Sequence, residues 1–181
     1  MTTIKTSEVN ARNILAAAAM AFSLAAPALA DSPDEVRARL SSASLSLPQA
    51  IEKGLEAAPG KVIDIDLDRD DGVVRYELEI ITAQQENIEV HVNAATGAID
   101  QFKNDGKASR KDLSRLEEAR IDITQAIDAA VKNTPGTPFS AQLDSHWGKT
   151  SYEVDILQAD GRIFEVKIDA ADGSILRTKQ D

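Results

Sequence analysis

A run of carboxylates in the first half of the chain has the residue types most able to bind a ligand. Five aspartates fall within the nine residues from Asp64 to Gly72. The candidate ligands are Asp64, Asp66, Asp68, Asp70, Asp71 and Glu77. Counted from Asp66, acids occupy positions 1, 3, 5 and 12, as they do in a calcium-binding EF-hand loop. The spacing therefore raises the hypothesis of a divalent-cation site, with Ca²⁺ as the ion.

The same segment departs from an EF-hand in two respects. The sixth loop position requires glycine for a sharp turn, and here it is Asp71. The flanking residues alternate between apolar and polar types, which indicates strands and not helices. The competing interpretation is a hydrated strand face that leads into a hairpin turn.

His146 and Trp147 form a second candidate site, in this case for a protein partner. We expect Trp147, the only tryptophan, to lie in a hairpin turn with no obvious core to fill. Its large amphipathic ring suits an interface, although packing between the two halves of the chain is the alternative. His91 and His146 are the only histidines, and both are expected on the solvated surface.

The residues needed for catalysis do not form a recognisable set. The chain has no cysteine, and the cluster of serines at 41–46 lies far in sequence from both histidines. It contains no Gly-x-Ser-x-Gly motif and no phosphate-binding glycine loop. We therefore expect a non-enzymatic protein without a cofactor, apart from the Ca²⁺ hypothesis.

The charge of the chain restricts its partners. The formal net charge is −10. Nucleic acid and anionic lipid surfaces should repel such a chain, whereas basic proteins and cations should attract it.

An internal repeat defines the structural unit. When residues 47–105 are compared with residues 123–181, an offset of 76, 20 of 59 positions are identical without a gap. Repetition at a fixed period marks a unit of structure. Because a single site does not need to occur twice, we interpret the shared residues as scaffold.

Each copy has the pattern of one helix followed by three strands. Ser46-x-x-Gln49 and Asp122-x-x-Gln125 are capping boxes, and apolar residues then recur at helical spacing until Pro-Gly. The alternating segments 63–67, 74–80 and 88–92, and 139–143, 152–156 and 164–168, predict antiparallel strands. Ile99 and Ile175 are expected to return to the core. The prediction is an α+β fold of two tandem repeats, each one helix on a three-stranded or slightly larger antiparallel sheet.

This order of elements resembles the PepSY domain. The family's closing motif is Asp169-Ala-Ala-Asp-Gly173-Ser-Ile175 in the second copy and Asn93-Ala-Ala-Thr-Gly97-Ala-Ile99 in the first, where Asn replaces the usual Asp. The resemblance covers 47–102 and 123–178. It implies a small extracytoplasmic module without catalytic residues that binds or inhibits peptidases.

The first thirty residues have the features of a secretory signal peptide. A mildly basic start precedes an apolar run from Ile14 to Ala26 and the cleavage motif Ala28-Leu29-Ala30. The predicted organisation is a signal peptide (1–30), an N-terminal segment (31–46), a first repeat (47–102), a charged linker with helical potential (103–121) and a second repeat (122–181). We expect no membrane insertion after cleavage, and a location in the periplasm, with secretion as the alternative.

These observations predict an exported, non-enzymatic binding or regulatory module. Its expected partner is an envelope peptidase or another envelope protein. The alternative function is divalent-cation binding or sensing by the acidic 64–71 hairpin.

Overall fold

A computed structural model of the chain describes residues 32–146 and 148–181. The predicted signal peptide and Trp147 lie outside the described residues. None of the helices in the described part is long and apolar enough to cross a membrane.

The first half of the fold contains two helices and four strands. They are α1 (Pro33–Ser42), α2 (Leu47–Ala57), β1 (Gly60–Asp70), β2 (Val73–Thr82), β3 (Glu86–Asn93) and β4 (Ile99–Lys107). The second half repeats this order with α3 (Arg110–Glu118), α4 (Ile123–Asn133), β5 (Thr137–His146), β6 (Lys149–Leu157), β7 (Ile163–Asp169) and β8 (Ile175–Gln180). The predicted α+β class and the tandem repeat are confirmed.

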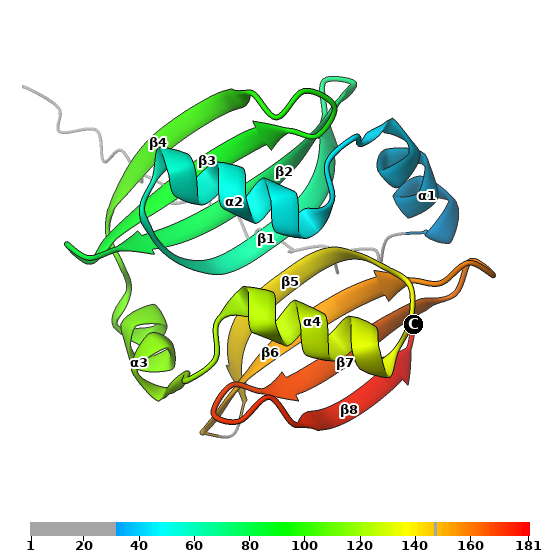
Figure 1. The fold of residues 1–181 in the computed structure, drawn as a ribbon. Coiled ribbons are helices and arrows are strands. Elements are labelled where there is room, and N and C mark those ends of the chain that lie inside the picture. The colour runs from blue at the N-terminus through cyan, green and yellow to red at the C-terminus, as the bar shows by residue number, and fades with distance from the viewer. Residues whose placement is uncertain (1–31, 147) are drawn as a thin grey trace, which may run out of the picture.

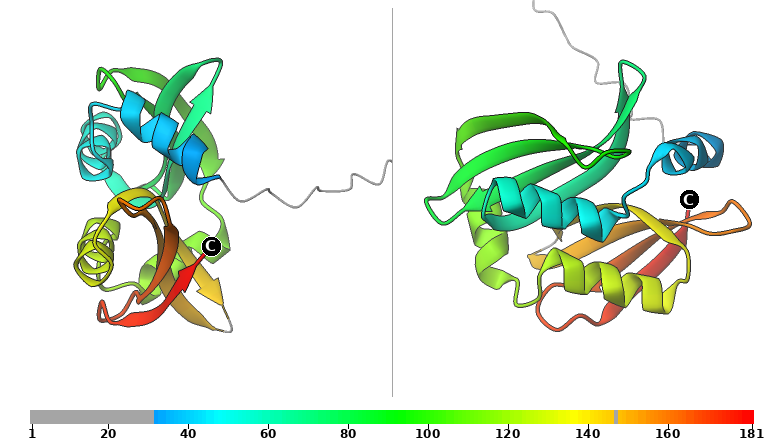
Figure 2. Two further views of the ribbon diagram at one scale, coloured as in Figure 1. Left: turned by 90° about the vertical axis from the view of Figure 1, so that its right-hand side faces the viewer. Right: turned by 45° about the horizontal axis from the view of Figure 1, so that its top comes forward.

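The two repeats form one antiparallel sheet of eight strands in the order β4-β3-β2-β1-β5-β6-β7-β8. Helices α2 and α4 lie side by side on one face of this sheet, as Figures 1 and 2 show. The opposite face carries neither of these two helices, and we call it the open face. Because α2 and α4 cover the same side, the sheet has one apolar and one polar surface.

Strands β1 and β5 join the repeats through three residue pairs, which we call the seam: Asp64 with Gln142, Ile65 with Ala141, and Asp66 with Ser140. At the offset of 76, Asp64, Ile65 and Asp66 correspond to Ser140, Ala141 and Gln142, so the three pairs contain only equivalent residues of the two repeats. The repeats are therefore related by a pseudo-twofold axis through Ile65 and Ala141, as in an isologous dimer.

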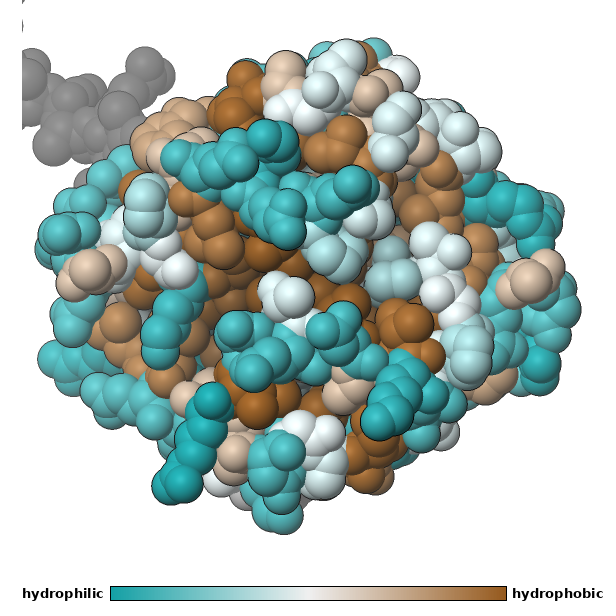
Figure 3. All heavy atoms as spheres, viewed as in Figure 1, coloured by the Kyte–Doolittle hydropathy of each residue, from teal (hydrophilic) through white to brown (hydrophobic). Residues whose placement is uncertain are grey.

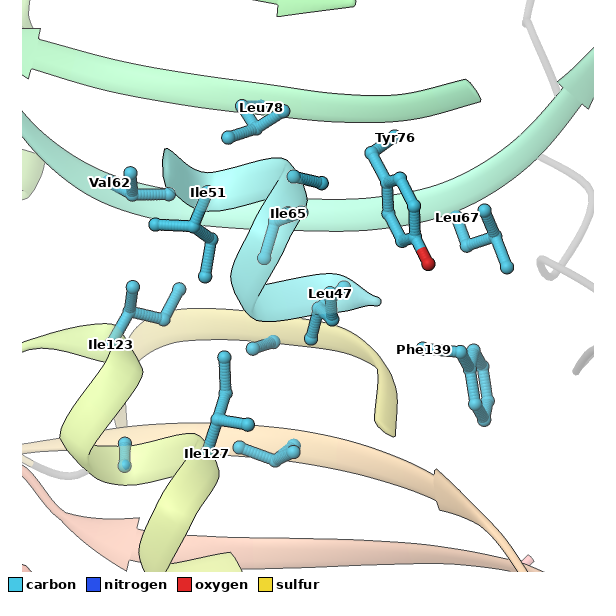
Figure 4. Packing of buried hydrophobic residues seen from close by; sticks show 14 of the residues in the cluster. Leu47, Ile51, Val62, Ile65, Leu67, Tyr76, Leu78, Ile123, Ile127 and Phe139 are labelled. Atoms are coloured by element: carbon cyan, nitrogen blue, oxygen red, sulfur yellow. The ribbon is translucent and has the colours of Figure 1, made fainter. Parts of the chain in front are cut away.

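The core lies between the helices and the seam. Leu47 and Ile51 of α2 point toward Ile123 and Ile127 of α4 above the paired central strands (Figure 4), and all four are at most 3% exposed. Ile65 is fully buried beneath them. Two units of this size each bury a limited core alone, and the shared layer stabilises both.

Local sequence signals account for the ends of the elements. Asp122 accepts a hydrogen bond from the Gln125 backbone N–H (2.9 Å), and the Asp122 N–H donates to the Gln125 side chain (3.0 Å). In the β1–β2 hairpin, Asp71 and Gly72 have φ of 48° and 80°. Two successive positive φ angles are typical of the type I′ turn, which matches the twist of the strands.

The repeat extends further than its periodic residues indicate. Strand β4 continues through Lys107, and α3 occupies the segment interpreted as a linker with helical potential. Helix α3 corresponds to α1 at the same offset of 76, since Leu40 and Leu116 take equivalent places and both pack against the core. Each of these helices is thus the first element of a repeat.

The fourth strands also correct one expectation. Ile99 and Ile175 were predicted to return to the core, but their exposed fractions are 40% and 37%. They begin β4 and β8, the two edges of the sheet. An edge strand has a neighbour on one side only, so its apolar residues are incompletely covered.

Candidate functional site

The open face carries a band of carboxylates across the middle of the sheet. It consists of Asp64 and Asp66 on β1, Glu77 and Glu79 on β2, Glu89 on β3, Glu153 and Asp155 on β6, and Glu165 on β7. We call this set the carboxylate band. Strand alternation produces it, because residues two apart point to the same face and the intervening apolar residues point toward the helices.

In the second repeat most of the band is neutralised by cations on the neighbouring strand. Glu153 is paired with Lys167, and Glu165 is paired with Arg177. Glu153 lies directly opposite Lys167, whereas Arg177 lies opposite Lys167 and therefore reaches Glu165 diagonally. This part of the open face therefore presents balanced charge.

In the first repeat the polar and basic side chains of the open face surround one acid, Glu89. Its carboxylate accepts from Gln101 (2.9 Å) and Lys103 (3.3 Å), and His91 Nε2 lies 2.7 Å from it. His91 Nδ1 is 3.8 Å from Glu77. His91 is on the open face as predicted, but its side chain is only 15% exposed because these acids surround it.

Carboxylates with no basic partner within the described residues lie beside the seam. Asp64 is opposite Glu79, Asp66 is opposite Glu77, and Asp155 is opposite Glu165. Directly opposed like charges destabilise a strand pair. The centre of the open face thus combines negative charge with partial burial.

Burial and these neighbours alter the acidity of Asp64 in the seam and of Asp155 beside it. Desolvation, followed by the nearby Asp66 and Glu79, raises the pKa of Asp64 to about 8. Desolvation, followed by Glu165, Asp181, Asp66 and Glu153, raises the pKa of Asp155 to about 7. Both carboxyls can therefore exchange a proton near neutral pH.

The structure does not support the predicted calcium loop. Asp64, Asp66 and Asp68 are spread along one side of an extended strand, Asp70 ends that strand, and Asp71 lies in the turn that follows. No group of three or more acids or histidines in residues 32–146 and 148–181 is arranged to hold a metal ion. A calcium site needs six to eight oxygens around one point, and an extended strand spreads them apart.

Asp68 has a different role, which its repeat partner shares. Arg39 of α1 donates to Asp68 (3.2 Å), and Arg115 of α3 pairs with Asp144. Both arginines and both aspartates are offset by 76. These ion pairs fasten each first helix to the first strand of its own repeat.

The repeated residues form further matching ties. Tyr76 donates to the Leu45 carbonyl (2.8 Å), and Tyr152 donates to the Ile121 carbonyl (3.0 Å). The amides that precede α2 and α4 donate in the same way to the carbonyls of Ala94 and Ala170. The interpretation of the shared residues as scaffold is thus supported by their contacts.

The candidate partner site at 146–147 is only partly described. His146 is exposed at the end of β5. Among the described residues, β5 contributes Ser140 and Gln142 to the open face at the seam, and His146 lies four residues beyond Gln142 at the end of the strand. The role of these two residues stays a prediction.

Two grooves open on the helix side, and the offset of 76 relates them as well. The larger has a volume of about 1090 Å³ and lies among the α1–α2 connection, Tyr76 and α4. The smaller, of about 360 Å³, lies among the α3–α4 connection, Tyr152 and α2. Figure 3 shows apolar surface between hydrophilic ridges on this side. The grooves offer a second surface on which an apolar segment could rest.

Sequence reasoning found Asp64 and Asp66 but missed Glu79 and Asp155, which lie on the strands beside the seam. Glu79 could have been found by extending the β1–β2 hairpin from its turn, because the register fixes which residues oppose each other. Asp155 could not, because the β1–β5 pairing joins segments with no short loop between them.

Comparison with known proteins agrees with the repeat. The model of the family described as "Peptidase propeptide and YPEB domain" (PepSY) matches residues 44–99 and 120–179. These ranges agree with the predicted repeats to within three residues. The uncharacterized protein YkoJ of Bacillus subtilis (strain 168) is 33% identical over 122 residues, which are 67% of this chain and 66% of that protein. The chain thus spans slightly less than two thirds of that relative.

Two solved structures of bacterial proteins also match the chain, both with a TM-score below 0.5. A candidate lipoprotein of Clostridium difficile 630 (CD1622) has a TM-score of 0.47 at 20% identity, with 77% of this chain and 95% of that chain covered. The YpmB protein from Bacillus subtilis has a TM-score of 0.34 at 16% identity, with 74% and 95% covered.

Proposed function

Because the chain belongs to the PepSY family, we propose that it is a non-enzymatic binding module that acts outside the cytoplasm and engages a peptidase or another envelope protein. The family description, which names a peptidase propeptide domain, supports the class of partner. The predicted signal peptide supports the compartment.

The observation that carries the proposal is the carboxylate band on the open face. In the second repeat Lys167 and Arg177 balance Glu153 and Glu165, whereas Asp64, Asp66 and Glu79 have no basic partner among the described residues of the first repeat. A partner with a basic patch would neutralise them. Complementary charge of this kind accelerates encounter and selects the partner.

Charge substitution tests this surface. Asp66→Asn with Glu79→Gln removes two exposed negative charges from the open face. Asp128→Asn with Glu52→Gln removes the same two side-chain types from exposed positions on α4 and α2. Residues 31–181, unchanged or with either pair of substitutions, are immobilised and exposed to an envelope extract in low salt. Each captured peptidase is then purified and assayed with the chain in solution.

We expect a peptidase that is captured in low salt, released by added salt and inhibited by the unchanged chain. The open-face pair should weaken both capture and inhibition, because exposed charges act over the screening length of the buffer. Equal weakening by the helix-side pair would place binding in the grooves. Absence of any captured protein whose activity the chain changes would refute the peptidase proposal.

A further inference from the structure

The connection between the two repeats is short and crowded with carboxyl groups. Three residue pairs form the seam between β1 and β5, whereas β1 and β2 pair over ten positions. The seam is also the only place in the sheet where the repeats share a strand ladder. Any repulsion at the seam therefore acts on the weakest strand pairing that holds the sheet together.

The groups that face the seam on the open side are almost all acids. On the side of the first repeat, β2 contributes Glu77 and Glu79, and β3 contributes Glu89 beyond them. On the side of the second repeat, β5 contributes only the neutral Ser140 and Gln142. Beyond β5, Glu153 and Asp155 lie on β6 and Glu165 lies on β7. The cations in the same rows are His91, Lys103, Lys167 and Arg177, together with Lys179 near Asp181. Each of them is engaged with Glu77, Glu89, Glu153, Glu165 or Asp181. Asp64, Asp66, Glu79 and Asp155 are left to repel one another.

We propose that the seam is a pH-responsive joint, which holds the two repeats together more firmly in mildly acidic solution than in mildly alkaline solution. Protonation of a seam carboxyl removes one of a pair of opposed charges and allows a hydrogen bond to its neighbour. Loss of that proton restores the repulsion across the shortest ladder of the sheet. The joint acts in the chain itself and requires no partner.

The direction of the effect follows from proton linkage. Burial raises the pKa of Asp64 from 3.8 to about 8 and that of Asp155 from 3.8 to about 7. Between those values the folded chain holds a proton that the unfolded chain has released, so the free energy of unfolding falls as pH rises. The stabilisation that comes from protonation of these carboxyls is complete below about pH 4. It is lost as pH rises through about 8 for Asp64 and about 7 for Asp155.

The second repeat provides a natural contrast. At the offset of 76, Asp64 corresponds to Ser140 and Asp66 corresponds to Gln142. Both acids within the three seam pairs, Asp64 and Asp66, therefore come from the first repeat. Ser140→Asp would place a carboxyl opposite Asp66 on one side and Asp155 on the other, and it should make the joint more sensitive to pH.

Thermal unfolding of residues 31–181 at pH 5 and pH 8, at constant ionic strength and with EDTA present, tests the proposal. Asp64→Asn and Asp155→Asn should each raise the midpoint by about 2–4 °C at pH 8 and change it little at pH 5. Ser140→Asp should lower the midpoint at pH 8 more than at pH 5. Glu52→Gln, on the exposed side of α2, is the control for removal of one charge and should behave alike at both pH values.

Amide hydrogen exchange locates the effect within the molecule. After correction for intrinsic exchange rates, the amides at 64–66 and 140–142 should lose about tenfold more protection between pH 5 and pH 8 than those of β3 and β7, because a tenfold change corresponds to about one pKa unit. Uniform loss across the sheet would overturn the joint, since it would indicate general charge repulsion. The joint would also be overturned if Asp64→Asn and Asp155→Asn each shifted the unfolding midpoint by the same amount at pH 5 as at pH 8.

Discussion

The two repeats share a scaffold but differ on the open face. At equivalent positions, Tyr76 and Tyr152 tie the strands to the helix entry, and Arg39 and Arg115 hold the first helices. On the open face, by contrast, His91 of the first repeat corresponds to Lys167 of the second. Gln101 corresponds to Arg177. The duplicated residues therefore build the fold, and the divergent residues decide which repeat carries uncompensated charge.

The difference extends to the pseudo-twofold axis itself. Ile65 and Ala141 face each other there, and both are fully buried. A large residue from one repeat thus fills the space beside a small residue from the other. The second repeat would leave a gap if it were paired with a copy of itself, so the repeats have become complementary and are no longer interchangeable.

The largest effect is expected from Ile65→Ala. This change makes both axial residues small and leaves a cavity under α2 and α4, at a cost of about 2–5 kcal/mol in the free energy of unfolding. Urea unfolding measures the loss. Ile99→Ala removes the same atoms from a residue that is 40% exposed and should cost clearly less. A smaller cost at residue 65 than at residue 99 would contradict the position of the core.

The next largest effect is expected from Gly60→Ala and Gly136→Ala, which test whether the two scaffolds are equivalent. A Cβ atom would lie 2.5 Å from the Ile81 carbonyl oxygen at Gly60 and 2.7 Å from the Leu157 carbonyl oxygen at Gly136. The backbone has to shift in either case, so each Gly→Ala change should cost about 1–3 kcal/mol. Urea unfolding of both variants checks this. A neutral result at one position alone would show that the two scaffolds are not equivalent.

Removal of the tyrosine hydroxyls should have a smaller effect, again alike in the two repeats. Tyr76→Phe and Tyr152→Phe each deprive a backbone carbonyl of its side-chain donor, at a cost of about 1–2 kcal/mol. The double variant should show nearly the sum, since the two sites do not share a partner. Chemical denaturation of the single and double variants measures both quantities. A large deviation from additivity would mean that the repeats communicate through the seam.

Most of the fold could be predicted because its signals are local. Capping boxes, alternation and the Asp71-Gly72 turn each lie within a few residues, and the structure confirms the elements that they indicate. The seam could not be predicted, because its pairs join residues 74, 76 and 78 positions apart and no turn fixes their register. The edge strands were missed for a related reason, since Ile99 and Ile175 begin strands that have a neighbour on one side only.

The site shows the same division between local and distant information. The acidity of the 64–71 segment is visible in the sequence and suggested a cation. The cross-strand partners determine instead what those acids do. Arg39 engages Asp68, Glu79 lies opposite Asp64, and Asp155 lies opposite Ser140, which is the seam partner of Asp66. The interpretation as a hydrated strand face was correct for Asp66 and Asp68, which are exposed, and incomplete for the half-buried Asp64.

The smallest effect is expected from Ca²⁺, and it separates an acidic surface from a cation site. Ligand that binds only the folded state raises the unfolding midpoint, and millimolar Ca²⁺ would do so at a site with micromolar affinity. The acids of β1 extend along a strand and do not surround a point, so we expect no more than the small rise produced by an equal ionic strength of NaCl. Mg²⁺ should match Ca²⁺, because neither ion finds a cage. A rise specific to Ca²⁺ and abolished by Asp66→Asn with Asp68→Asn would contradict this prediction and restore the first repeat as a cation-binding unit.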